Sequence, residues 1–290
     1  MAKKANKVIK RRSVWQEATE RLFRNRLAML GLAILLIVII LCSLAGVICP
    51  DGQNAQNPSN ALIAPCKEFI FGTDQLGRSM LSRVLYGGRV SILIAFVSTA
   101  ISAALGTILG TVAAYYGGTV DDIIMRVLDV FSAIPNLLLA IALAAILGSG
   151  VFNCMLAVGV AAVPGFARVV RAPILAVMNN EYIEAARSID ATDRRIMFVH
   201  VLPNVLSPII VQATTNLAQA ILMAASLSFL GLGVQAPNAE WGALLSTGRE
   251  FIKKQPYLTM VPGMAIASVV FSMNLFGDGV RDALDPKLKY

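Results

Sequence analysis

Charged and metal-binding side chains are scarce in this sequence of 290 residues. Only 14% of the residues are charged, whereas a soluble globule needs about a quarter to solvate its surface. This shortage excludes disordered chains, secreted disulfide scaffolds and most soluble enzymes. The apolar share of 57% and the mean hydropathy of +0.69 instead predict that a lipid bilayer is the solvent.

Metal ligands and catalytic motifs are missing as well. Histidine occurs once, as His200, and the four cysteines form no C-x-x-C pair. No lysine follows a glycine, so the phosphate-binding motif G-x-x-x-x-G-K-[ST] is absent. The G-x-S-x-G motif of many hydrolases is also absent. We therefore predict no catalytic residue, no metal site and no cofactor site in this chain. Cys49 and Cys66 fall in one polar segment. The sequence leaves two alternatives for them, a disulfide bond or two free thiols.

Basic residues are concentrated at the N-terminus. Residues 1–26 contain nine Lys and Arg against two Glu, just before the first apolar run. Such a cluster is typical of a cytoplasmic anchor facing anionic lipid, rather than of a nucleic-acid surface. Within it, Trp15, Ala18, Leu22 and Phe23 recur at helical spacing, which predicts an amphipathic helix on the inner membrane surface.

Long uncharged stretches predict an all-α integral membrane protein with six transmembrane helices. One uncharged stretch is too long for a single helix, and Gly148-Ser149-Gly150 divides it. Pro135, Pro164 and Pro208 can bend or break helices. The predicted spans are 27–48, 90–115, 127–147, 151–171, 207–232 and 257–276.

Lys and Arg counts predict that both termini are cytoplasmic. The basic leader is too long, and the first apolar run exceeds the core of a signal peptide, so we expect that run to remain as a helix. The expected parts are the cytoplasmic segment 1–26, the first span 27–48, an extracytoplasmic loop 49–89, a five-helix core 90–276 and a cytoplasmic tail 277–290. The polar loop 49–89, together with 234–256, either docks an external partner or packs as a lid on the helices.

Ionisable residues are nearly absent from the predicted spans. Secondary transporters and channels usually need such groups at membrane depth. Asp129 is expected near the inner interface, three residues after Arg126, where the two can pair on one helix face. The sequence therefore disfavours a self-sufficient secondary transporter.

The cytoplasmic connection 178–204 has a helix-turn-helix pattern. Asn179 or Asn180 can cap a first helix, and Glu181 and Glu184 suit its N-terminal end. A second helix can begin with Asp190 as its cap.

This connection resembles the EAA loop of ABC importer permeases, whose form is E-A-A-x3-G-x9-I-x-L-P. Glu184-Ala185-Ala186, position 190, position 200 and Leu202-Pro203 match it with complete spacing. Asp190 replaces the usual glycine, and His200 replaces the isoleucine of the general form. Asp tolerates a left-handed turn better than most residues, so the turn can be kept. Residues 178–204 are called the EAA segment below.

Further stretches are similar to the oligopeptide, dipeptide and nickel branch of that family. Arg24-Asn25-Arg26-Leu27-Ala28 resembles the N-terminal region of its second, or C-type, permease subunit. The other matching stretches are 72–78 with 82–91, 225–233, Trp241-Gly242 and 277–286. Together they cover nearly the whole chain.

The resemblance implies a type I ABC importer permease in a bacterial or archaeal cytoplasmic membrane. It further implies a homologous second permease, two ATPase subunits that bind ATP and Mg, an external solute-binding protein and peptide cargo. Nickel chelates and glutathione-like peptides are alternative cargoes, and a non-transporting scaffold is an alternative role. The residues implied to couple to an ATPase are Tyr182, Glu184, Ala185, Ala186, Arg187, Asp190, Ala191, Leu202 and Pro203.

Overall fold

The computed structural model describes residues 14–285, which form helices joined by turns and loops. The basic residues before Val14 and the last five residues lie outside this part. The helices are α1 (Val14–Arg24), α2 (Arg26–Ser43), α3 (Ala45–Ile48), η1 (Pro58–Asn60), α4 (Met80–Tyr116), α5 (Gly118–Ser132), α6 (Asn136–Leu147), α7 (Val151–Ala161), α8 (Val163–Met178), α9 (Glu181–Ser188), α10 (Asp193–Arg195), η2 (Ile196–Val201), η3 (Leu202–Val205), α11 (Leu206–Phe229), α12 (Trp241–Gly248), η4 (Arg249–Phe251) and α13 (Tyr257–Leu284).

Four helical segments in the described part are long and apolar enough to cross a membrane. They are α2, α4, α13 and the continuous stretch Asp193–Phe229, which ends with α11. Two pairs of shorter helices, α5 with α6 and α7 with α8, reach the required length only when each bent pair is taken together. With each pair counted as one span, the total is the predicted six.

The two bent pairs break close to prolines. Helices α5 and α6 meet at 88°, and Pro135 stands directly before α6. Helices α7 and α8 meet at 40°, and Pro164 lies in the first turn of α8. Proline lacks an N–H and its ring clashes with the preceding turn, so a straight helix cannot continue through it without distortion. Of the three prolines expected to bend or break helices, Pro135 and Pro164 lie at the two breaks, whereas Pro208 lies in the first turn of α11, which continues through it.

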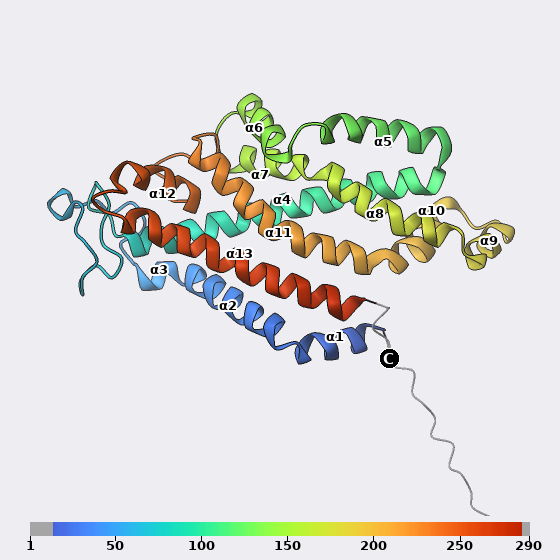
Figure 1. The fold of residues 1–290 in the computed structure, drawn as a ribbon, viewed down its shortest axis with the longest axis horizontal. Coiled ribbons are helices and arrows are strands. Elements are labelled where there is room, and N and C mark those ends of the chain that lie inside the picture. Colours follow the sequence, from blue (N-terminus) through green and yellow to red (C-terminus); the bar gives the residue numbers. More distant parts are fainter. Residues whose placement is uncertain (1–13, 286–290) are drawn as a thin grey trace, which may run out of the picture.

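Helix α4 is the central element of the bundle and packs against α2, α7, α8 and α11 (Figure 1). Glycines allow its close approach to α8. A Cβ atom on Gly106 would lie 2.7 Å from the Cβ of Phe166, and one on Gly110 would lie 2.5 Å from the carbonyl oxygen of Ala167. Small residues bring membrane helices together because packing between them depends on dispersion contacts.

Helix α4 begins before the span predicted over 90–115. Its first residue is Met80, and the Ser79 hydroxyl accepts a hydrogen bond from the N–H of Ser82 at 3.5 Å as its cap. The last ten residues of the predicted loop 49–89 are therefore helical. The prediction followed uncharged residues only, so the arginines of this first part of the helix concealed its start.

An amphipathic helix precedes the first span, as the N-terminal pattern predicted. In α1, Ala18 is buried, while Trp15 and Phe23 remain largely exposed. The helix packs against α13. Asn25 then caps α2, because its side-chain oxygen accepts the N–H groups of residues 27 and 28 at 3.1 Å each.

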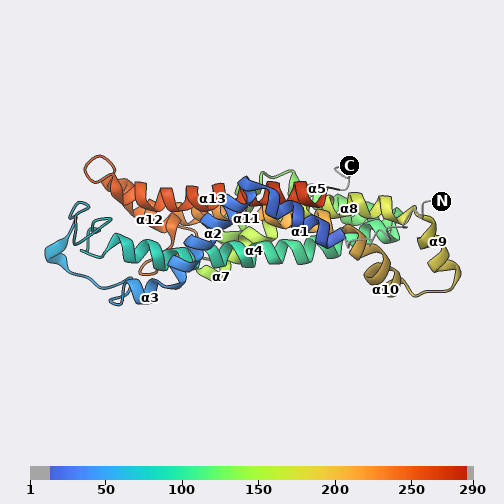
Figure 2. The ribbon, with the colours of Figure 1, turned by 90° about the horizontal axis from the view of Figure 1, so that it is seen from below.

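The elongated bundle has different elements at its two ends. The loop between α3 and α4 lies at one end with α12, and α9 and α10 lie at the other (Figure 2). Helix α1 and the C-terminal end of α13 lie in the half that contains α9 (Figure 1). Both described chain ends are thus directed to the side predicted to be cytoplasmic.

Candidate functional site

The first part of the EAA segment, with α9, forms a tip at one end of the bundle, and from Asp193 onward the segment is continuous with the stretch that ends with α11. Helix α9 follows α8 after two residues, and its first turn carries Glu181 and Glu184, as predicted. Asn180 occupies the cap position, but its side chain donates to the carbonyl of Val177 instead of capping α9. The carboxylates therefore face the positive end of a short helix without a side-chain cap.

One face of α9 is buried against the bundle. Ile183 and Ala186 pack with Phe166, Val170 and Ile174 of α8 in a shared apolar cluster. The opposite face is open, and large apolar side chains are exposed there. Tyr182 is 43% exposed and Ile189, just after the helix, is 80% exposed. These two side chains and the charged residues between them leave this face of α9 accessible from outside the chain.

The implied coupling residues are divided between this open face and the bundle. Ala186 is buried, so only Ala185 of the Ala-Ala pair is available on the surface. Ala191 and Leu202 are half-buried and pack against the same apolar cluster. The exposed members are Tyr182, Glu184, Ala185, Arg187, Asp190 and Pro203.

Asp190 forms the turn of the EAA segment and is not a helix cap. Its φ of +58° is left-handed, which explains why glycine is usual at this position. Helix α10 begins at Asp193 with Thr192 as the cap residue, so the predicted capping by Asp190 is wrong. The sequence left open how Asp190 affects this turn, and the structure shows that its backbone adopts the left-handed conformation usual for glycine.

Two contacts fasten the tip to α4. The hydroxyl of Tyr115, in the last turn of α4, donates a hydrogen bond to a carboxylate oxygen of Asp193 at 2.7 Å. The guanidinium of Arg187 lies over the Tyr115 ring, 5.8 Å from its centre. Sequence reasoning missed Tyr115, because it treated this residue only as the end of a span. Its phenol is nevertheless typical of a membrane-interface position, where one end of the ring is apolar and the other polar.

Ion pairs join α5 to α8 near the same end. Nη2 of Arg168 lies 2.7 Å from Oδ1 of Asp129. Nε of Arg171 donates a hydrogen bond to Oδ1 of Asp121 at 2.6 Å. A second N–H of Arg171 donates to the other oxygen of Asp121, so this contact is bidentate. The expected pairing of Asp129 with Arg126 is therefore replaced by a bond between helices.

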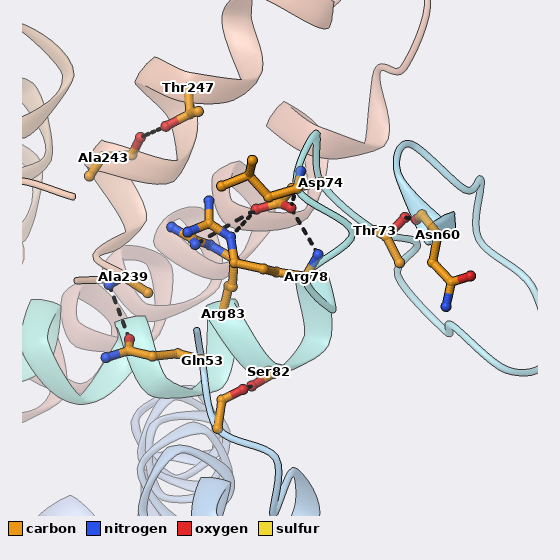
Figure 3. Close-up of polar contacts among 12 residues, drawn as sticks. Gln53, Asn60, Thr73, Asp74, Arg78, Ser82, Arg83, Ala239, Ala243 and Thr247 are labelled. Atoms are coloured by element: carbon orange, nitrogen blue, oxygen red, sulfur yellow. Dashed lines mark hydrogen bonds and ion pairs between the residues drawn. The ribbon is translucent and has the colours of Figure 1, made fainter. Parts of the chain in front are cut away.

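At the opposite end, three charged residues form a buried cluster (Figure 3). Asp74, Arg78 and Arg83 are each at most 6% exposed. One Asp74 oxygen accepts the backbone N–H groups of Leu76 and Arg78 at 2.9 Å each. The other accepts Nε of Arg78 at 2.7 Å and lies 3.7 Å from Nη1 of Arg83. We call Asp74, Arg78 and Arg83 the outer cluster.

The loop around the outer cluster packs closely on the helices. The Tyr257 hydroxyl lies 3.0 Å from the carbonyl oxygen of Ile63 and 2.8 Å from that of Thr73, positioned to donate to either. The Gln53 side chain accepts the N–H of Ala239 at 3.0 Å (Figure 3). Packing as a lid is thus observed. The four cysteines are unpaired, with Cys49 half-buried and Cys66 exposed, so the alternative of two free thiols holds.

Comparison with known families decides the class of the chain. Residues 106–290 match the family described as binding-protein-dependent transport system inner membrane component. The chain belongs to this family. Residues 13–65 of the permease also match the N-terminal transmembrane domain of oligopeptide transport permease C. The resemblance inferred from the EAA segment is confirmed.

Relatives of the permease are similar over nearly its whole length. It is 44% identical to a dipeptide transport system permease protein of Alkalihalophilus pseudofirmus, over 96% of this chain and 91% of the relative. It is 41% identical to a di/tripeptide transport system permease protein of Pseudomonas aeruginosa, over 91% and 89%. It is 43% identical to a glutathione transport system permease protein of Escherichia coli, over 96% and 92%.

A solved structure shows the same fold. The MetNI methionine ABC transporter, described as inward facing, matches 70% of this chain and 96% of its own chain, with a TM-score of 0.58 and 18% identity. The permease is thus a multi-pass inner-membrane component with an ABC importer fold and no catalytic or cofactor-binding role. Its family requires a separate ATPase and a binding protein as partners.

Glycines of the matching stretches have a packing role in the permease. A Cβ on Gly88 would lie 2.4 Å from Sγ of Cys42 and 2.7 Å from the Trp241 ring. The Trp241 indole N–H donates to the carbonyl of Val84 at 2.9 Å, and buried Glu240 accepts the hydroxyl of Ser91 at 2.9 Å. These contacts hold α12 on the first turns of α4, so the Gly-Gly pair of α4 and the Trp-Gly pair of α12 form one packed unit.

Proposed function

We propose that this permease is one of two homologous membrane subunits of a peptide importer. Two ATPase subunits, an external solute-binding protein and the surrounding lipid complete the assembly. The printed functions of the relatives support a peptide cargo, since they are dipeptide, di/tripeptide and glutathione permeases. Di- and oligopeptides are the favoured cargo, and glutathione-like peptides or nickel chelates are the alternatives.

The tip formed by α9 is the proposed contact with one ATPase subunit. The observation that carries this proposal is its division into an open face and an anchored face. Glu184 and Ala185 are exposed, whereas Ile183 is fully buried and Tyr115 bonds the segment to α4. A movement imposed on the open face would therefore displace the membrane helices. It would shift the equilibrium between their inward-open and outward-open states.

Substitution on the open face of α9 tests the coupling role. Ala185→Arg and Glu184→Lys are expected to abolish peptide uptake and the binding-protein-stimulated ATPase activity, since each places an unmatched cation in the contact. Membrane insertion is expected to remain normal, because both side chains are exposed. Asp122→Lys is the control, an exposed charge reversal on α5 outside the EAA segment. Normal uptake by Ala185→Arg at normal expression would contradict the assignment.

Cargo is tested separately with the parent importer. Uptake of dialanine, glutathione and a nickel–histidine chelate into proteoliposomes containing all subunits is compared at equal binding-protein occupancy. Dialanine is expected to be transported, and preference for the chelate would overturn the peptide proposal. Recovery of the tagged permease without a second permease or an ATPase would overturn the proposed assembly and revive the secondary-transporter alternative.

The outer loop is proposed to contribute to docking of the binding protein, in addition to packing as a lid. Its support is the exposed apolar side chain of Ile70, which is 61% exposed at the end of the molecule opposite α9. Ile70→Asp is expected to weaken stimulation of the ATPase by the binding protein several-fold while basal activity is kept. Asn54→Asp, an exposed substitution elsewhere in the loop, is the control. Equal stimulation in both variants would leave the loop with a packing role only.

A further inference from the structure

Polar side chains are grouped at mid-depth of the bundle, although the spans are almost free of charge. A small pocket of about 20 Å³ lies there. It is bordered by the centre of α4 and the centre of α11. We call it the mid-depth pocket, and its lining residues are Ser98, Thr99, Ser102, Asn136, Val158, Ala162, Asn216, Gln219, Ala220 and Met223.

Two side chains of the mid-depth pocket have unused hydrogen-bonding atoms. Thr99 and Asn216 are each only 6% exposed. The hydroxyl of Thr99 and the amide nitrogen of Asn216 have no hydrogen-bond partner among the described residues. The amide oxygen of Asn216 is used, because it accepts Nε2 of Gln212 at 3.1 Å. A buried polar atom without a partner costs free energy, so these atoms favour a polar group arriving from outside the chain.

Both helix breaks of the permease border this pocket. Asn136 is the first residue of α6, directly after the 88° bend, and Ala162 lies at the 40° bend between α7 and α8. The first turn of a helix has N–H groups without intrahelical acceptors and a partial positive charge. Irregular backbone at membrane depth is tolerated where it is buried in protein or lines a water-filled cavity, and interrupted helices commonly border the substrate sites of transporters.

The polar face of α11 continues from this pocket towards the α9 end. Gln212 and Thr215 line a second cavity of about 740 Å³ between α1, α8, α11 and the end of α13. Asn216 and Gln219 follow at helical spacing and line the mid-depth pocket. Amide side chains are expensive to place against lipid tails, so this face of α11 is suited to an aqueous route.

We propose that the mid-depth pocket is a contact site for the main chain of the peptide during translocation. This inference rests on the proposed peptide cargo. The lining offers neutral hydroxyl and amide groups that both donate and accept, which matches the C=O and N–H groups common to all peptides. No lining residue is ionisable, so the site selects no particular side chain. A pocket of about 20 Å³ has room for one polar group of about the volume of a water molecule, so it receives a single carbonyl oxygen or N–H of the peptide at a time while the rest of the chain stays outside.

Uptake by the complete importer tests the site. Asn216→Leu and Thr99→Val are expected to reduce dialanine uptake into proteoliposomes at least fivefold relative to the parent importer at equal reconstitution of all subunits. Thr99→Ser restores the hydroxyl and is expected to restore uptake. Thr111→Val is the matched control on α4, because the Thr111 hydroxyl is also buried without a described partner and lies outside the pocket. Pocket variants that transport as well as Thr111→Val would overturn the proposal.

A labelling measurement separates this inference from the cargo proposal. Gln219→Cys is made in a background in which Cys49 and Cys66 are serine, since Cys42 and Cys154 are buried. A membrane-impermeant thiol reagent is expected to label the Gln219→Cys variant during ATP turnover, and added dialanine is expected to protect the variant from labelling. The Phe271→Cys variant on α13 is expected to stay unlabelled. If the parent importer transports no dialanine, the peptide cargo is wrong, and with it the peptide ligand of the pocket. If dialanine is transported and Gln219→Cys is never labelled, only the mid-depth site is wrong.

Discussion

Neutralising Asp74 is the sharpest test of how the outer end is held together. Asp74 accepts two backbone N–H groups and one guanidinium N–H, and a second guanidinium lies within 3.7 Å. Asp74→Asn keeps the size of the side chain but removes its negative charge. Arg78 and Arg83 would then be two buried cations without the carboxylate between them. The NH₂ group of the new side chain would also replace one acceptor oxygen and point a donor at other donors.

The expected loss of stability follows from this geometry. Removing one partner of a buried ion pair costs about 3–5 kcal/mol, because the remaining charge stays desolvated. Each 1.4 kcal/mol corresponds to a tenfold change, so the loop around residues 62–74 should open roughly 100- to 4000-fold more often. The cost is confined to the outer loop and the first turns of α4, since the other pairs of the bundle do not depend on Asp74.

Amide hydrogen exchange on the purified importer measures this opening directly. The informative amides are those of Leu62 and Thr73, which are bonded to the carbonyls of Asp74 and Ile63 at 3.0 Å each. Asp51→Asn, an exposed neutralisation in the same loop, is the control and should leave both rates unchanged. Exchange of these amides within threefold of the parent in Asp74→Asn would refute the idea that the carboxylate holds the loop.

Two further predictions concern packing and thiol reactivity. Gly242→Ala should destabilise the permease by about 1–3 kcal/mol, because its Cβ would lie 2.3 Å from a backbone carbonyl oxygen of α11. Gly165→Ala, whose Cβ meets nothing within 4 Å, should not, and a higher melting temperature for Gly242→Ala than for Gly165→Ala would contradict this. Burial raises the pKa of the Cys49 thiol above its usual range, so little thiolate forms at neutral pH. A thiol reagent at pH 7 should therefore modify exposed Cys66 first, and labelling of Cys49 should accelerate as the pH is raised. Equal rates of labelling at pH 7, followed by mass spectrometry, would argue against it.

Much of the fold follows from local properties of the sequence. The lengths of the uncharged stretches predict the number of spans, and Pro135 and Pro164 lie at the helix breaks. Both features depend only on residues that are close together in the sequence. The turn at Asp190 stayed open from the sequence, because glycine is usual at this position and aspartate is not, and only the structure shows the left-handed backbone.

Contacts between distant segments could not be predicted in this way. Asp129 was expected to pair within its own helix, but the packing of α5 against α8 brings Arg168 closer. The bond between Tyr115 and Asp193 joins residues that are 78 positions apart, and no spacing rule relates them. The start of α4 could not be predicted for a different reason. Arg83 looked like a charge that ends a membrane span, whereas in the folded chain it is buried beside Asp74.

The length of α4 gives the permease the properties of a lever. Its 37 residues form a rod about 55 Å long at 1.5 Å per residue. The last turn bonds to the EAA segment, the centre borders the mid-depth pocket and the first turn carries Arg83 of the outer cluster. Rotation by about 10° around the centre would carry both ends through about 5 Å in opposite directions. The centre of α4 would stay in place. A displacement of its last turn would therefore move its first turn in the opposite direction, while the residues of α4 at the mid-depth pocket would hardly shift.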